Sequence, residues 1–189
     1  MVDPGAYVRH EPGVTRQRAH ALAGPGQVGE LPEDMRDDTV RWLAATGGMV
    51  VVIEPGTPAG YERVVRARDV LIQAGLHVTA PCPHERECPE NWCHFAARLP
   101  RLGHHQVIKE GTLNFEDEKF SYVAAAPTDH RRAANRVVRH PQKRKGMVSL
   151  QLCTAEGNLE DRVVSKRHGE LYRGARDITW GDEWPPNAE

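Results

Sequence analysis

The stretch APCPHERECPENWCHF, residues 80–95, constrains the fold of this chain more than any other segment. It contains Cys82, Cys88 and Cys93 in the spacing C-x5-C-x4-C, and the remaining cysteine of the 189-residue sequence is Cys153. Three prolines and the polar residues HERE indicate a loop rather than a core element. Such a loop needs a reason to gather its thiols, and a fold in which Cys153 joins them must bring a distant segment to the same place.

The sequence favours a reducing compartment for these thiols. No run approaches the ~18 apolar residues that a membrane span needs, and the N-terminus MVDPGAYVRHEPG lacks the apolar stretch of a secretory signal. We therefore expect a cytoplasmic protein. Thiols stay reduced in the cytoplasm, so a cysteine cluster there more often binds a metal or does redox chemistry than forms disulfides.

Thiolate ligands favour zinc and iron–sulfur clusters, and a strand that carries Cys153 would supply the fourth ligand. Most thiolate zinc sites use paired C-x2–4-C spacings, which this stretch lacks, whereas a [4Fe–4S] cluster tolerates longer spacings. His84 and His94 keep a mixed cysteine and histidine zinc site open as the alternative. Catalysis by Cys82 or Cys93 as a nucleophile is disfavoured, because a catalytic thiol needs no such neighbours.

Residues 131–145, RRAANRVVRHPQKRK, form a basic segment in a chain whose formal net charge is −1. Phosphate backbones are the natural partners of such a segment, and a solvated basic loop is the alternative. The segment contains no acid, and its cations are Arg131, Arg132, Arg136, Arg139, Lys143, Arg144 and Lys145.

The first half of the chain has the pattern of an α/β layer. Helices are predicted at 32–45 and 59–74 from their apolar stripes, and Gly75 suits the end of the second. The apolar run MVVVIEP at 49–55 and the shorter LHVTAP at 76–81 are typical of strands. Helix, buried strand, helix, strand is the order found where parallel neighbours are joined by crossover helices.

The rest of the chain divides around this layer. Residues 1–30 are rich in glycine and proline, and we interpret them as a poorly ordered arm or truncated stump. Residues 31–127 are predicted to form a partial α/β domain that includes the insertion 80–95, with a helix broken at Pro100 and a strand at KFSYVAAAP. Residues 128–189 hold short β-rich runs and are predicted to form a small antiparallel unit.

A second candidate site follows the strand MVVVIEP. Ligands bind at the carboxyl ends of strands in doubly wound sheets, so Glu54, Pro55 and Gly56 form a candidate ligand loop. Pairing of Glu54 with an arginine is an equally good interpretation. The loop is not a phosphate loop, and no spacing in the chain argues for a catalytic triad or any other catalytic residue.

Several strings in the sequence resemble one family. They are GGMVVVIEPGTPAGYERVVRARDVLIQAG, the cysteine stretch with its continuation AARLPR, FEDEKFSYVA, LQLCTAEG and VVSKRHGELYRGARDITWGDEWP. Together they are similar to the C-terminal half of the methyltransferase-like, Rsm-type family, whose members are small ribosomal subunit assembly factors in bacteria and mitochondria. The resemblance covers about residues 27–186.

This resemblance implies a partial class I, Rossmann-like methyltransferase sheet with a metal-binding insertion and a small C-terminal β unit, in which QVGELP ends the fourth strand. It also implies that Cys82, Cys88, Cys93 and Cys153 ligate a [4Fe–4S] cluster. The implied partners are small-subunit ribosomal RNA and the pre-ribosomal small subunit. Lys109, Lys166 and Arg167 are then candidates to extend the RNA-binding cations of residues 131–145.

The resemblance leaves out the half that holds S-adenosylmethionine in methyltransferases of this class. Residues 1–26 lack its glycine-rich turn, so we do not expect this chain alone to bind S-adenosylmethionine or transfer a methyl group. An rRNA methyltransferase that obtains the missing half from another chain, or from a longer reading frame, is the alternative function. A zinc-binding RNA-binding module is another.

Overall fold

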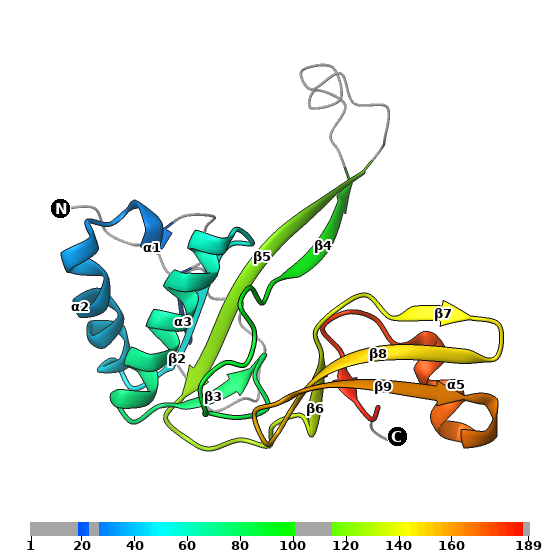
Figure 1. Cartoon of the computed structure of the whole chain (residues 1–189). Helices are drawn as coiled ribbons and strands as arrows, with labels where there is room; N and C mark the ends of the chain where they lie inside the picture. Colours follow the sequence, from blue (N-terminus) through cyan, green and yellow to red (C-terminus); the bar gives the residue numbers. More distant parts are fainter. Residues whose placement is uncertain (1–18, 23–26, 101–114, 187–189) are drawn as a thin grey trace, which may run out of the picture.

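The computed structural model describes residues 19–22, 27–100 and 115–186, which fold around two sheets that lie side by side (Figure 1). Within these residues, the strands up to Ala126 form the first sheet and those from Asn135 onward form the second. Each sheet has its own hydrophobic core. No helix in this part of the chain is long and apolar enough to cross a membrane.

The first sheet is mixed rather than parallel. Its strands are β1 (Ala19–Leu22), β2 (Met49–Pro55), β3 (His77–Ala80), β4 (Phe95–Pro100) and β5 (Phe115–Ala126). β1 and β2 are parallel, but the long β5 lies between β2 and β3 and is antiparallel to both. The prediction that neighbouring strands would be parallel is therefore wrong beyond β1 and β2, because the crossover from β2 to β3 leaves a position that β5 fills.

The outer edge of β5 is shared by two strands. β3 pairs with its C-terminal end, where His77 lies opposite Ala126, and β4 pairs with its N-terminal half from Phe115 to Phe120. Between these pairings, residues 121–123 of β5 have no strand partner on this edge within the described residues. The cysteine-rich loop 81–94 runs from β3 to β4 and therefore passes this gap.

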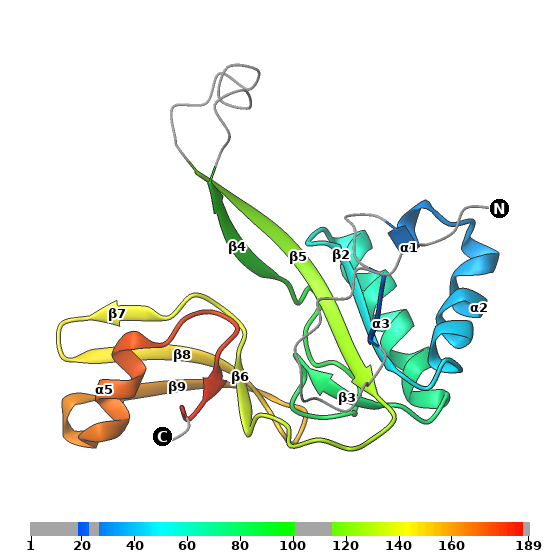
Figure 2. The same ribbon diagram turned by 180° about the vertical axis from the view of Figure 1, so that it is seen from behind.

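Helices α1 (Gln27–Glu30), α2 (Glu33–Ala44) and α3 (Pro58–Gln73) lie together beside the first sheet (Figure 2). The side chain of Thr57 accepts a hydrogen bond from the Gly60 amide at 3.1 Å and caps α3, as its place before a proline suggests. Gly75, with φ of 85°, follows the end of this helix. Both predicted helices are thus confirmed to within a residue or two.

The structure describes part of residues 1–30 and corrects two expectations about secondary structure. Within residues 1–30, the described residues form β1 and α1, and Val28 of α1 is buried. QVGELP begins with the helix α1 instead of ending a strand. The segment after the cysteine loop is the strand β4 rather than a helix, because its residues pair with β5, and its continuation to Lys109 lies outside the described residues.

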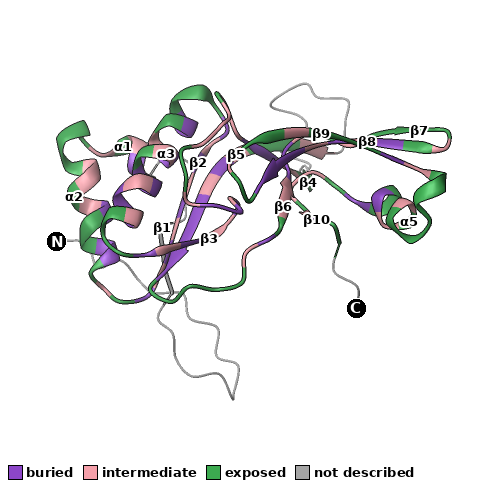
Figure 3. Ribbon diagram, turned by 60° about the horizontal axis from the view of Figure 1, so that its bottom comes forward, coloured by how far each residue is buried: buried purple, intermediate pink, exposed green. Residues whose placement is uncertain are grey.

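The second sheet is antiparallel, as predicted. Its strands are β6 (Asn135–Val137), β7 (Gln142–Arg144), β8 (Met147–Thr154), β9 (Leu159–Ser165) and β10 (Glu183–Trp184). β8 pairs with β9 on one edge and with β6 and β7 on the other. The short helix η1 (Lys166–His168) and α5 (Glu170–Asp177) follow β9, and Figure 3 shows α5 beside the second sheet. Ala175 of α5 is part of the hydrophobic core of this sheet.

Candidate metal centre

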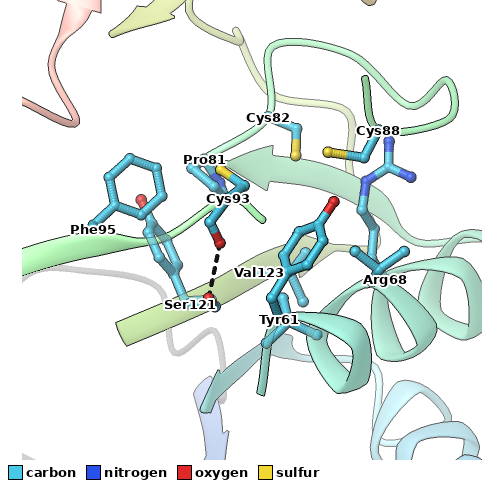
Figure 4. A pocket seen from close by; sticks show the side chains of 12 residues that line it. Tyr61, Arg68, Pro81, Cys82, Cys88, Cys93, Phe95, Ser121 and Val123 are labelled. Carbon is cyan, nitrogen blue, oxygen red and sulfur yellow. Dashed lines mark hydrogen bonds between the residues drawn. The ribbon is translucent and has the colours of Figure 1, made fainter. Parts of the chain in front are cut away.

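The four cysteines line one small pocket at the junction of the two sheets. Three of them belong to the loop between β3 and β4, and Cys153 comes from the end of β8 in the second sheet. Cys153 is 6% exposed, and the loop cysteines are half-buried. Figure 4 shows the thiols of Cys82 and Cys88 pointing toward one another above α3, with Cys93 nearby. The fold therefore brings the fourth thiol to the other three.

Hydrogen bonds from β5 and α3 hold the loop in the gap along β5. The Ser121 hydroxyl, at the unpaired part of β5, donates to the carbonyl of Cys93 at 2.8 Å. The Tyr61 hydroxyl, from the first turn of α3, donates to the carbonyl of Glu90 at 2.6 Å. These two bonds replace strand pairing for the loop backbone, so Cys93 enters β4 from a fixed position.

Arg68 is a buried cation beneath the loop. It is 3% exposed, and its Nη2 donates to the carbonyls of His84 at 3.1 Å and Arg86 at 2.7 Å. The pocket that it lines with Val64 also contains Cys82, Cys88 and Cys93. Its Nε has no hydrogen-bond partner among the described residues. Sequence reasoning missed Arg68, although a charge between Val64 and Leu71 on the apolar face of a helix was a usable signal.

The first four arginines of the basic segment bind the protein itself. Arg136 donates from Nε to the carbonyl of Pro81 at 2.8 Å and from Nη1 to that of Gly181 at 2.9 Å. Arg132 donates to the carbonyl of Val78 at 2.9 Å, and its Nη2 lies 2.6 Å from the carboxylate of Glu85.

The other two of these four arginines also form ion pairs within the protein. Arg139 pairs with Glu90 at 2.9 Å, and Arg131 pairs with Glu183 at 2.6 Å. Arg132, Arg136 and Arg139 thus link the start of the second sheet to β3 and to the cysteine loop. Lys143, Arg144 and Lys145 of the same segment lie on β7 and its turn, are exposed, and form no ion pair with a described residue.

His84 makes the most direct contact with a thiol. Its Nε2 lies 3.3 Å from Sγ of Cys153, and its ring is 3% exposed. Burial, assisted by the nearby Arg68 charge, lowers the pKa of His84, so the ring is neutral at neutral pH. A neutral ring with its proton on Nε2 donates to the sulfur and leaves Nδ1 as an acceptor, and Nδ1 has no partner among the described residues.

Burial also governs the thiols. It raises the pKa of Cys153 to about 12, with a smaller effect from Cys82 and Cys88. Burial likewise raises the pKa of Cys82 and of Cys93. The thiols of Cys82, Cys93 and Cys153 therefore stay protonated at neutral pH when no cation is bound. If the cysteines bound a metal group as thiolates, they would release their protons. The positive metal would offset the repulsion among the negative sulfur atoms.

The pocket offers the sulfur donors and the nearby positive charge that a thiolate-ligated metal group would need. Within the described residues, no three His, Cys, Asp or Glu side chains are arranged to hold one metal ion. The thiols instead surround a pocket that Arg136 also lines, and Arg68 lies against three of them. The buried Nε–H of Arg68, which has no partner among the described residues, suits the negative sulfur atoms of a thiolate-ligated metal group.

Glu54 and Gly56 of the candidate ligand loop at the end of β2 already bind other groups of the protein. Glu54 is fully buried, and its carboxylate accepts from Arg63 Nε at 2.8 Å and from the Gly29 amide at 3.1 Å. The Gly56 amide donates to the carbonyl of Lys119 on β5 at 2.8 Å. Of the two interpretations of Glu54, the structure therefore shows the pairing with an arginine, Arg63.

The comparisons with known proteins concern ribosome assembly. Residues 27–185 match the family described as mitochondrial small ribosomal subunit Rsm22. The chain is 30% identical over 201 residues to the human mitochondrial ribosome assembly protein METTL17, covering 96% of this chain and 43% of that protein. It is 21% identical over 275 residues to the mitochondrial ribosome assembly protein RSM22 of Saccharomyces cerevisiae, covering 90% of this chain and 44% of that protein.

A third relative is the mitochondrial Rsm22-cox11 tandem protein 1 of Schizosaccharomyces pombe, 28% identical over 185 residues, with 74% of this chain and 25% of that protein covered. The chain thus spans less than half the length of these relatives. The prediction of a cytoplasmic location is wrong, because the family and these relatives are mitochondrial. Import segments for mitochondria are amphipathic and rich in arginine, so the lack of an apolar secretory signal did not argue against that compartment.

Proposed function

The chain belongs to the Rsm22 family, as the resemblance in its sequence indicates, and on that premise we propose that it binds ribosomal RNA during assembly of the mitochondrial small ribosomal subunit. We also propose that Cys82, Cys88, Cys93 and Cys153 hold a [4Fe–4S] cluster. The observation that carries the proposal is the convergence of these four thiols, from both sheets, on one pocket.

The position of the pocket suggests what the cluster would contribute. When bound, it would supply a covalent cross-link between the β3–β4 loop and β8. The protein provides the remaining links across this junction, including Arg136 to Pro81 and Arg86 Nη1 to the carbonyl of Glu156 at 2.7 Å. A rigid junction would keep the RNA-facing side of the second sheet in a fixed orientation to the first sheet. The proposed role is therefore structural.

The charges near the pocket suit a thiolate-ligated metal group, whose net charge is negative. Arg68 and Arg136 would balance the net negative charge of a thiolate-ligated cluster. His84 would orient the sulfur of Cys153 through its ring N–H.

The basic segment supports RNA binding only in part. Arg131 pairs with Glu183 of the second sheet, whereas we assign Arg132, Arg136 and Arg139 a role in holding the junction together. The exposed cations that remain available to phosphates are Lys143, Arg144 and Lys145. Lys109, the other candidate between β4 and β5, lies outside the described residues.

The function is tested by association with assembling ribosomal particles. Chain purified without oxygen is mixed with small-subunit precursors from mitochondria and separated on a density gradient. We expect it to sediment with the precursors at low salt and to dissociate as salt rises, because phosphate contacts release counterions. A Cys88→Ser chain should associate less, whereas Arg66→Met, at an exposed pair on α3, serves as the control. A chain that never sediments with the precursors would contradict the proposal.

A further inference from the structure

Figure 1 shows the β7–β8 turn and the segment after β9 at the end of the second sheet away from the first sheet. The cations of these segments are exposed. β7 and β8 form a tight hairpin in which Arg144 pairs with Met147 and Lys145–Gly146 make the turn. Gly146 adopts φ of 82°, which a glycine takes without strain. Because the turn is short and strand-paired, Lys143, Arg144 and Lys145 project from a rigid support.

The helix η1 adds two cations to the same end. The Lys166 amide donates to the carbonyl of Gly146 at 3.1 Å, which fixes η1 against the hairpin turn. The Ser165 amide donates to Nδ1 of His168 at 2.9 Å and closes the first turn of η1. Lys166 and Arg167 are exposed beside the turn, and we call the five residues Lys143, Arg144, Lys145, Lys166 and Arg167 the basic tip.

The basic tip is free of compensating acids. Residues 139–149 and 162–168, which build this end of the sheet, contain no Asp or Glu. None of its five cations forms an ion pair with another described residue, in contrast to Arg132 and Arg139 near the junction. Five like charges held this close repel each other, and a polyanion relieves the repulsion.

The surroundings of the tip also lack large aromatic side chains. Residues 139–149 and 162–168 contain no Phe, Tyr or Trp. Tyr172 of the adjoining α5 packs against the core of the second sheet, and Trp180 packs against His94 and His140. Binding of single-stranded RNA relies on aromatic platforms for its bases, whereas double-helical RNA is recognised by its phosphates and shape.

We infer that the basic tip binds the phosphate backbones of double-helical RNA and does not read its bases. This inference rests on the RNA-binding role proposed above and narrows it to one surface and one class of RNA. Rigid cations spaced along a hairpin and a neighbouring helix suit the fixed phosphate positions of an A-form helix. Without a platform of Phe, Tyr or Trp, the same surface offers unstacked bases mainly charge.

The experiment compares two RNAs with the full chain. The probes are an RNA duplex of about 20 base pairs, longer than the ~16 that double-stranded RNA domains span, and one of its strands alone. Affinities are measured over a range of salt concentrations. The test variant is Lys143→Ala/Arg144→Ala/Lys145→Ala. The control removes three exposed arginines that pair with acids in the first sheet unit, Arg41→Ala/Arg66→Ala/Arg98→Ala, so that the net charge changes equally.

We expect the duplex to bind at least ~10-fold more tightly than the strand at equal salt, with the salt slope of the test variant reduced by about three. The control variant should bind as the wild type does. Tighter binding of the single strand, or equal losses in both variants, would overturn the inference while leaving RNA binding in place. Failure of the wild type to bind either RNA at low salt would overturn the RNA-binding proposal as well.

Discussion

Sγ of Cys153 on β8 lies 3.3 Å from Nε2 of His84, a residue 69 positions earlier in the chain. The contact joins the second sheet to the cysteine loop of the first sheet at a buried point. Gly157, in the turn after β8, adopts a φ of 82°, and a Cβ there would lie 3.2 Å from the side chain of Arg86. Metal ligands are commonly oriented by such hydrogen bonds from a neighbouring group.

Removal of this hydrogen bond should loosen the bound cluster. His84→Phe keeps a ring but loses the N–H donor, so we expect the ~400 nm absorbance of a thiolate-ligated iron–sulfur centre to bleach about 10-fold faster in the presence of a chelator. His84→Gln, which retains a side-chain N–H, should bleach at an intermediate rate. Equal rates in all three proteins would show that the ring serves only to fill space.

Replacement of the buried Arg68 should destabilise the fold. Arg68→Met leaves the carbonyls of His84 and Arg86 without their donor inside the protein. The expected loss is about 3 kcal/mol in the free energy of unfolding, measured in urea. Arg66→Met, two positions earlier on α3 and exposed, should leave the urea midpoint nearly unchanged. If both variants shift the midpoint alike, the buried hydrogen bonds of Arg68 do not stabilise the loop.

Addition of a methyl group at Gly60 should disturb the start of α3. A Cβ at this position would lie 2.0 Å from the carbonyl oxygen of Pro55, which is backbone and cannot move aside cheaply. We expect Gly60→Ala to lower the free energy of unfolding by about 2 kcal/mol, within the range found for overpacked sites. Unchanged thermal stability would mean that the turn from β2 into α3 relaxes more easily than its contacts indicate.

The Asp37–Arg66 pair should give a stability change in acid. The Arg66 guanidinium, by hydrogen bonding to Asp37, holds the pKa of that carboxyl below its usual 3.8, so the unfolded chain binds this proton more readily than the folded one. The contribution of the pair is therefore complete above about pH 4 and is lost as pH falls through the folded pKa. Asp37→Asn should flatten this part of the pH–stability curve. An identical acid limb in wild type and variant would contradict the assignment.

Local patterns in the sequence predicted much of the first layer. The apolar run of β2 and the stripes of α2 and α3 were sufficient, because residues three to four apart on a helix share a face whatever the rest of the chain does. The place of β5 was not predictable in this way. Its pairing with β2 and β3 depends on segments about 45 to 75 positions apart, and a strand pattern does not specify its neighbour.

The candidate site was likewise predictable from the sequence only in part. The thiols were recognisable because their residue type implies their chemistry, and the loop position followed from the prolines. The arginines were recognised as charges but not as links within the protein, since the partners of Arg132 and Arg136 include backbone carbonyls more than 50 positions away. Only the folded chain distinguishes these half-buried, hydrogen-bonded cations from the exposed ones of the basic tip.

The central claim is that the four thiols hold an iron–sulfur cluster, and metal and sulfide analysis of the full chain tests it most directly. Chain purified without oxygen should contain about four iron atoms and four acid-labile sulfides, with a broad absorbance near ~400 nm, as four-thiolate ligation of a [4Fe–4S] cluster requires. A Cys153→Ser chain should contain markedly less iron and sulfide. A colourless wild-type protein that contains one zinc ion and no sulfide would contradict the account.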